Sequence, residues 1–240
     1  MFYHAALLFD TTGFAQEARA LAQRVDRGDL QLLHQRATQI AAATPAALFP
    51  LRAYGEPLRQ PRPLADVGTN PVSNAEIGDW LMIVLSQYVR PCPSSIGFHW
   101  QALKLALRER GWTQAECDLL MHGQPLGTLI GKAPVGIQDH IVRHHDPYWR
   151  WIRPDYSYTH GGWLGLEHCA TFFRRLCARD HELRQRTHAP GRHLPEDLRA
   201  SAIQGYQAAC HMLSAALQAH QGLYMVILWD QPDVGDAHGG

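Results

Sequence analysis

The segment Phe2-Tyr-His-Ala-Ala-Leu-Leu-Phe9 is almost entirely apolar, and Asp10-Thr-Thr-Gly13 breaks the pattern directly after it. A short apolar run bounded by turn-forming residues is typical of a buried β-strand. Near the other end of the chain, Leu223-Tyr-Met-Val-Ile-Leu-Trp229 is also apolar and is rich in residues that favour strands. Because a lone strand leaves its backbone amides and carbonyls unpaired, we expect both segments to share one sheet, with room for a third strand that the sequence does not identify.

The chain between these strands has the pattern of amphipathic helices. Helices are predicted on both sides of Gly28, after capping-box motifs that start at Ser73 and Thr113, and after Ser94 as a cap. The apolar stripes assigned to the buried faces of later helices are Phe98, Ala102, Leu105 and Ala106; then Leu166, Cys169, Ala170, Phe173, Leu176 and Cys177; and finally Ile203, Tyr206, Cys210, Leu213 and Leu217.

These elements predict an α+β fold, a predominantly helical single domain with a small sheet formed by the N-terminal and C-terminal strands. Hydrophobic residues make up 46% of the 240 residues and charged residues 18%, which is enough apolar surface for a core. No spacer rich in proline, glycine or serine divides the chain, so one domain is expected over residues 1–230, with residues 231–240 as a flexible C-terminal tail.

Composition disfavours several classes of partner. Lysine plus arginine and aspartate plus glutamate number 22 each, so no net field attracts nucleic acid or an anionic membrane. The five cysteines form no C-x-x-C pair, the N-terminus lacks the features of a signal peptide, and no apolar run approaches the roughly 18 residues of a membrane span. The cytoplasm is therefore the expected location, with a protein or a small molecule as partner.

The segment from Ile137 to His168 concentrates residues that could carry chemistry, in a chain with 15 histidines. Histidine, tyrosine, tryptophan and arginine side chains supply ligands, proton carriers and aromatic contact surface. Gly161-Gly162, within this segment, permits an unusual backbone turn for the close approach of a ligand or for a tight connection to the next helix. The candidate functional residues are His140, His144, His145, Asp146, Tyr148, Arg150, Arg153, Tyr158, His160 and Trp163.

A divalent metal is one interpretation of this segment. If residues 137–145 are helical, His140 and His144 lie one turn apart on one face and could hold one metal ion, with Asp146 or His160 as a third ligand. The other interpretation is structural, because Asp139 and Arg143 form an i,i+4 ion pair and Asp146 before a proline is a good helix cap. The H-E-x-x-H signature of a zinc hydrolase is absent from the sequence.

The aromatic and arginine residues from Tyr148 to Trp163 also allow two interpretations. They could stack on bases or sugars or hold a phosphate, or they could pin an irregular segment to the core while arginine stems cover the rings. The neutral overall charge favours the second.

The remaining motifs for catalysis are weaker. The glycines from Gly123 to Gly131 lack the register of a phosphate-binding loop, there is no G-x-S-x-G motif, and Cys92 lies between prolines without a neighbouring base. The leading hypothesis is therefore a binding or accessory module without catalysis. The alternative is a metal- or histidine-dependent small-molecule enzyme that uses the segment from His140 to His160.

Two short motifs suggest a relationship. Leu119-Leu-Met-His-Gly-Gln-Pro-Leu126 marks the stop of a helix, and Gly162-Trp-Leu-Gly-Leu-Glu-His168 opens an amphipathic helix. With a strand at each end of a helical middle, this arrangement resembles bacterial YfbM-like proteins of unknown function. The motifs cover a small part of the chain, and the histidine-rich stretch from Ile137 to His145 is not part of that pattern. The resemblance implies an α+β fold and no established activity.

Overall fold

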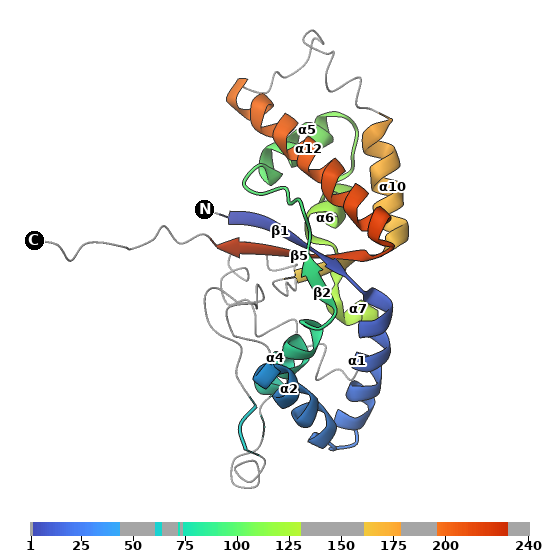
Figure 1. Ribbon diagram of the computed structural model, residues 1–240. Helices are drawn as coiled ribbons and strands as arrows, with labels where there is room; N and C mark the ends of the chain where they lie inside the picture. The colour runs from blue at the N-terminus through green and yellow to red at the C-terminus, as the bar shows by residue number, and fades with distance from the viewer. Residues whose placement is uncertain are drawn as a thin grey trace, which may run out of the picture.

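The computed structural model describes residues 2–43, 61–63, 72, 74–130, 161–178 and 196–229. Over these residues the chain forms an antiparallel sheet of five strands between two layers of helices, in the strand order β2-β1-β5-β4-β3 (Figure 1). The strands are β1 (Phe2–Phe9), β2 (Val89–Pro91), β3 (Gln124–Pro125), β4 (Gly161–Leu164) and β5 (Gly222–Trp229). The protein is thus α+β and predominantly helical, as the sequence predicts.

The two terminal strands pair along their whole length. Phe2 lies opposite Trp229 and Phe9 lies opposite Gly222, with the register unbroken between them. This pairing confirms the central prediction from the sequence. It also places strands from opposite ends of the chain in the middle of the sheet, where β2 is attached to β1, β4 is attached to β5, and β3 is attached to β4.

Three short strands complete the sheet. β2 pairs with the C-terminal half of β1, β4 pairs with the N-terminal half of β5, and β3 pairs with β4. The sequence identifies none of them, because each has only two to four residues and contains proline or glycine. Gly162 and Trp163, expected at the opening of a helix, lie instead in strand β4.

Each face of the sheet is covered by helices (Figure 1). On one face lie α1 (Thr11–Val25), α2 (Gln31–Ala43), α4 (Asn74–Leu85) and α7 (Leu126–Ile130). On the other lie α5 (Trp100–Glu109), α6 (Gln114–His122), α10 (Leu166–Cys177) and α12 (Glu196–Ala219), with α12 packed against both α5 and α10.

Two hydrophobic cores result from the alternation of side chains along the strands. Phe9 and Tyr224 face the first layer and pack with Phe14, Leu33, Trp80, Leu81 and Leu126, which form the α4-side core with their neighbours. Leu8, Leu223 and Met225 face the second layer and pack with Trp100, Leu103, Cys117, Cys169, Tyr206 and Leu213, which form the α12-side core with theirs. The sheet therefore contributes to both cores.

The helix starts differ in part from those expected. Asp10 does not simply break the chain, because its carboxylate accepts a hydrogen bond from the Gly13 N–H at 2.9 Å and so caps α1. The capping box of Thr113 and Glu116 is present as predicted. Ser94, however, caps no helix: its hydroxyl donates to the Ala208 carbonyl at 3.1 Å, and α5 begins six residues later, at Trp100.

The predicted stripes of α5, α10 and α12 are confirmed only in part, since the residues of them that are buried are Ala102, Ala106, Cys169, Leu176, Tyr206 and Leu213. Phe98, Leu105, Leu166 and Ile203 are exposed, and Cys177 is exposed too. The residues buried in their place are Trp100, Leu103 and Leu107 on α5, Phe172 on α10, and Ala202, Ala209, Met212 and Ala216 on α12.

None of the helices in the described part of the chain is both long enough and apolar enough to cross a membrane.

Candidate functional site

Most of the predicted functional residues lie outside the described residues. These are His140, His144, His145, Asp146, Tyr148, Arg150, Arg153, Tyr158 and His160, and the proposed tail at 231–240 lies outside them as well. Trp163 is the one candidate with described surroundings, and the site is therefore built outward from it.

Trp163 is half-buried in strand β4, directly after the candidate segment. Its ring packs against the α4-side core. Its indole N–H donates a hydrogen bond to the hydroxyl of Thr128 on α7, with a distance of 3.0 Å between Nε1 and Oγ1. The indole thus has one side on the core and its polar edge toward an exposed hydroxyl, which is a typical environment for tryptophan at a binding surface.

Two glycines fix the position of Trp163. A Cβ atom on Gly162 would lie 1.9 Å from the carbonyl oxygen of His122, and one on Gly123 would lie 2.6 Å from the backbone nitrogen of Trp163. Gly123 also has a φ of +70°, which favours glycine. Gly162, the second glycine of the pair noted in the sequence, therefore serves the close packing of β4 against the end of α6 and against β3.

His168 lies beside Trp163, in the first turn of α10. A Cβ atom on Gly165 would lie 3.2 Å from the Trp163 ring and 3.7 Å from Nδ1 of His168, so both side chains flank this glycine. The amide nitrogen of Gln124 lies 3.3 Å from Nε2 of His168. Because an amide nitrogen only donates, this contact requires Nε2 of His168 to be the acceptor.

Four elements therefore bring an indole, an imidazole, an amide and a hydroxyl together. We call Gln124 on β3, Thr128 on α7, Trp163 on β4 and His168 on α10 the Trp163 surface. Such a set can hydrogen-bond a polar group and offer an aromatic edge to it. The sequence names Trp163 as a candidate and places His168 at the end of the same segment, whereas Gln124 and Thr128 are brought to Trp163 by the pairing of β3 with β4, which no local pattern predicts.

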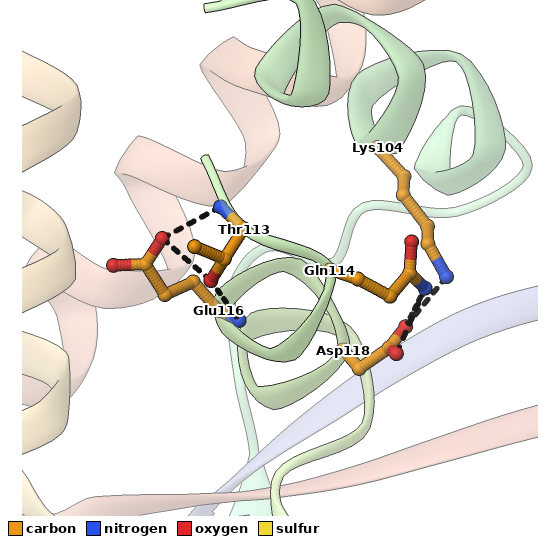
Figure 2. A network of polar contacts seen from close by, with 5 residues as sticks. All are labelled: Lys104, Thr113, Gln114, Glu116 and Asp118. Atoms are coloured by element: carbon orange, nitrogen blue, oxygen red, sulfur yellow. Dashed lines mark hydrogen bonds and ion pairs between the residues drawn. The ribbon is translucent and has the colours of Figure 1, made fainter. Parts of the chain in front are cut away.

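A second polar network joins α5 to α6 (Figure 2). The Asp118 carboxylate, of which 5% is exposed, accepts hydrogen bonds from Nζ of Lys104 at 2.5 Å and from the side-chain amide of Gln114 at 2.8 and 2.9 Å. On the other side of α6, the Thr113 N–H donates to the Glu116 carboxylate at 2.7 Å. These contacts hold α5 and α6 together, and both oxygens of the buried Asp118 carboxylate accept hydrogen bonds.

Glu116 also connects α6 to α10. Its carboxylate accepts a hydrogen bond from the Arg175 guanidinium, which lies 4.2 Å above the centre of the Trp112 ring. The hydrogen bond from Arg175, with those from Thr113, lowers the pKa of Glu116 to about 2. The carboxylate is therefore held ionised as a structural partner rather than poised for proton transfer near neutral pH.

A third network lies in the layer that contains α1, α2 and α4. There Tyr88 donates a hydrogen bond to Glu17, and Nε of Arg36 donates to the same carboxylate at 2.7 Å. Burial, together with the hydrogen bond to Glu17, raises the pKa of Tyr88 to about 12. The phenol thus stays protonated, and it ties the end of α4 to α1 and α2.

The cysteines of the described residues are free thiols. Burial raises the pKa of Cys92, Cys117 and Cys169, in the last case to about 12, so these three resist ionisation. Within the described ranges, no three histidine, cysteine or carboxylate side chains group closely enough to hold a metal ion.

Comparison of the chain with protein-family models, with curated proteins and with solved structures gave no match. The resemblance to bacterial YfbM-like proteins stays a prediction from the sequence.

Proposed function

We propose that this chain is a cytoplasmic binding or accessory module and that it recognises a protein partner through the Trp163 surface. The observation that supports this proposal is the meeting of Gln124, Thr128, Trp163 and His168, from four separate elements, beside the first turn of α10. Tryptophan is enriched among the few residues that carry most of the binding energy of protein interfaces.

The sequence next to the Trp163 surface supports a protein partner. Residues 148–160 lead directly into β4 and carry Tyr148, Arg150, Arg153 and Tyr158, whose types are enriched at interface hot spots. The balance of 22 basic and 22 acidic residues gives nucleic acid no general attraction. The buried free thiols of Cys117 and Cys169 suit a reducing compartment such as the cytoplasm.

A crosslinking experiment tests the location of the surface. A photo-crosslinking amino acid is placed at Thr128 and, as the matched control, at exposed Gln101 on α5 in the opposite layer. We expect a discrete crosslinked protein from the Thr128 position and none from Gln101. Crosslinking from Gln101 alone would place the partner on the wrong side of the molecule for this proposal.

The partner identified in this way, once purified, tests the role of Trp163 by calorimetric titration. Trp163→Ala should weaken binding by at least about tenfold, since it removes the aromatic anchor, whereas Trp163→Phe should retain part of the affinity. Leu105→Ala, at an exposed residue of α5, is the control and should leave Kd unchanged. Equal affinities for the wild type and Trp163→Ala would exclude the proposed surface.

The enzymatic alternative has a separate test. If His140, His144, Asp146 and His160 form a metal-dependent site, protein purified without a histidine tag should contain a stoichiometric divalent metal, and His144→Ala should remove it. A metal content of zero in the wild type, after incubation with zinc and gel filtration, would eliminate this alternative and leave the binding proposal intact.

A further inference from the structure

His4 is a fully buried histidine in the middle of the fold. It lies in β1, where side chains alternate between the two faces of the sheet, so that it points to the same side as Ala6 and Leu8. Both of those residues belong to the α12-side core. The imidazole is therefore enclosed between the sheet and the layer of α5, α6, α10 and α12, with an exposed fraction of 0%.

Neither ring nitrogen of His4 has a hydrogen-bond partner among the described residues. The backbones of Met121, on α6, and of His4 itself lie near enough to raise the pKa of the ring, but burial outweighs them, and neither meets the geometry of a hydrogen bond to a ring nitrogen. A buried polar group without partners costs free energy, and a buried unpaired charge costs much more. The site therefore tolerates the neutral ring and opposes the charged one.

Titratable groups in the layer that covers His4 have partners of their own: Nδ1 of His99, just before α5, lies 2.9 Å from the Ser201 hydroxyl, and Arg175 on α10 pairs with Glu116. On α6, Asp118 is paired with Lys104, and the His122 ring lies against the Trp100 ring with centroids 5.8 Å apart. On α12, the Tyr206 hydroxyl donates to the carbonyl of Leu176 at 3.0 Å. Among the described residues, no charged side chain contributes to the pKa of His4, so nothing in them offsets a proton on its ring.

The backbone of His4 holds the turn that precedes α5. The His4 N–H donates to the Gly97 carbonyl at 3.1 Å, and the Gly97 N–H donates to the His4 carbonyl at 3.0 Å. Ile96 and Trp100, on either side of this turn, are buried in the α12-side core. A displacement of His4 from its pocket would therefore also release the attachment of α5 to the edge of β1.

We propose that His4 is an acid-sensitive latch: the neutral ring keeps the α12-side core closed, and protonation of the ring favours release of the Gly97 turn and opening of that core. Opening would expose apolar surface that includes Trp100 and Ile96, so mild acid would change what the protein can associate with. This device is independent of the Trp163 surface.

The direction of the pH effect follows from burial. Burial lowers the pKa of His4 from 6.5 to about 4, so the open form binds a proton more readily than the closed form. The closed form has its full stability relative to the open form above about pH 6.5, and this stability decreases as the pH falls from 6.5 to 4. By this linkage the opening equilibrium constant should rise about thirtyfold between pH 8 and pH 5.

The cysteines of the chain provide the measurement. Cys117 and Cys169 are buried in the α12-side core, and Cys177 at the end of α10 is exposed. Full-length protein is treated at pH 8 and at pH 5 with a pyridyl disulfide reagent, and each cysteine is quantified by mass spectrometry. The rates at Cys117 and Cys169 are divided by the rate at Cys177 in the same chain, which removes the intrinsic pH dependence of the reagent.

We expect this ratio to rise about thirtyfold at pH 5 in the wild type and in His211→Gln, which changes an exposed histidine of α12. It should stay flat in His4→Leu, which fills the pocket with an apolar side chain, and in His4→Gln, which stays polar but cannot take up the proton. The second variant preserves the test if the first one packs badly. A flat ratio in the wild type, or a rise that persists in both His4 variants, would overturn the proposal.

Discussion

Gly162 is the residue on which the Trp163 surface depends most directly. The His122 carbonyl occupies the space that a side chain would need, so β4 can reach β3 and the end of α6 only with glycine at this position. Trp163, the next residue, takes its place against Thr128 from that close approach. The absence of a side chain at Gly162 thus allows the strand geometry that positions the proposed recognition surface.

Gly162→Ala should therefore destabilise the protein by about 2–4 kcal/mol, because the new methyl group would lie 1.9 Å from a backbone oxygen and the strands must separate. Gly165→Ala is the control, since its methyl group would meet side chains rather than backbone, the Trp163 ring at 3.2 Å and Nδ1 of His168 at 3.7 Å, and should cost less than about 1 kcal/mol. Urea denaturation of both variants measures the difference. Equal midpoints for the two variants would show that the contact at Gly162 relaxes without cost.

At the scale of elements, the pairing of α5 with α6 depends on a nearly buried ion pair. Nζ of Lys104 and the carboxylate of Asp118 are 16% and 5% exposed on a side-chain basis, and both are removed from most solvent. Desolvation of such a pair offsets much of its attraction, so its net contribution is small while the loss of one partner is costly. The pair thus fixes the position of α5 against α6 more than it adds to the stability of the fold.

We expect Asp118→Leu to destabilise the protein by about 3 kcal/mol, because it leaves the Lys104 amine without its carboxylate in a low-dielectric site. The double variant Lys104→Met with Asp118→Leu should recover most of that loss, since no unpaired charge stays behind. A double-mutant cycle by guanidinium denaturation gives both numbers. If the double variant were as unstable as Asp118→Leu, then the charge would not be the reason for the loss.

The elements also show where sequence patterns suffice. The two long strands were predictable because each is a continuous apolar run, and the capping box at Thr113 was predictable because it is local. The stripe on α5 was right for Ala102 and Ala106, which are buried, but wrong for Leu105, which is 50% exposed. Apolar residues lie on more than one face of that helix, and Leu103 and Leu107 are buried instead. Periodicity establishes a helix, but it does not say which apolar side meets the core.

The candidate site follows the same rule. Trp163 was named because of its residue type, and His168 follows it closely in the sequence, whereas Gln124 and Thr128 join them only after a two-residue strand pairs with a four-residue one. Such short strands have no period that a sequence window can detect. Contacts between residues some 40 positions apart, such as that of Gln124 with His168, depend on tertiary packing and are invisible to local reasoning.

At the scale of the whole molecule, β1 and β5 connect everything that the structure describes. They come from opposite ends of the chain, they pair over their full length, and each contributes side chains to both cores. Neither helical layer can therefore keep its core intact while these two strands are apart. Because the strands are shared, the α4-side core and the α12-side core should lose their structure together at pH 8, where the His4 latch is closed, rather than one after the other.

Unfolding at pH 8, where the His4 latch is closed, tests this coupling. Trp80 fluorescence reports on the α4-side core when the other tryptophans are replaced by phenylalanine, and the reactivity of Cys117 reports on the α12-side core. Leu81→Ala leaves a cavity in the α4-side core and Leu103→Ala leaves one in the α12-side core. Each should lower the free energy of unfolding by about 2–5 kcal/mol. If β1 and β5 bind both layers into one cooperative unit, each substitution shifts the urea midpoints of both probes equally. A Leu81→Ala variant that moves only the Trp80 transition would mean that the sheet does not transmit the loss, and that the two layers are separate folding units.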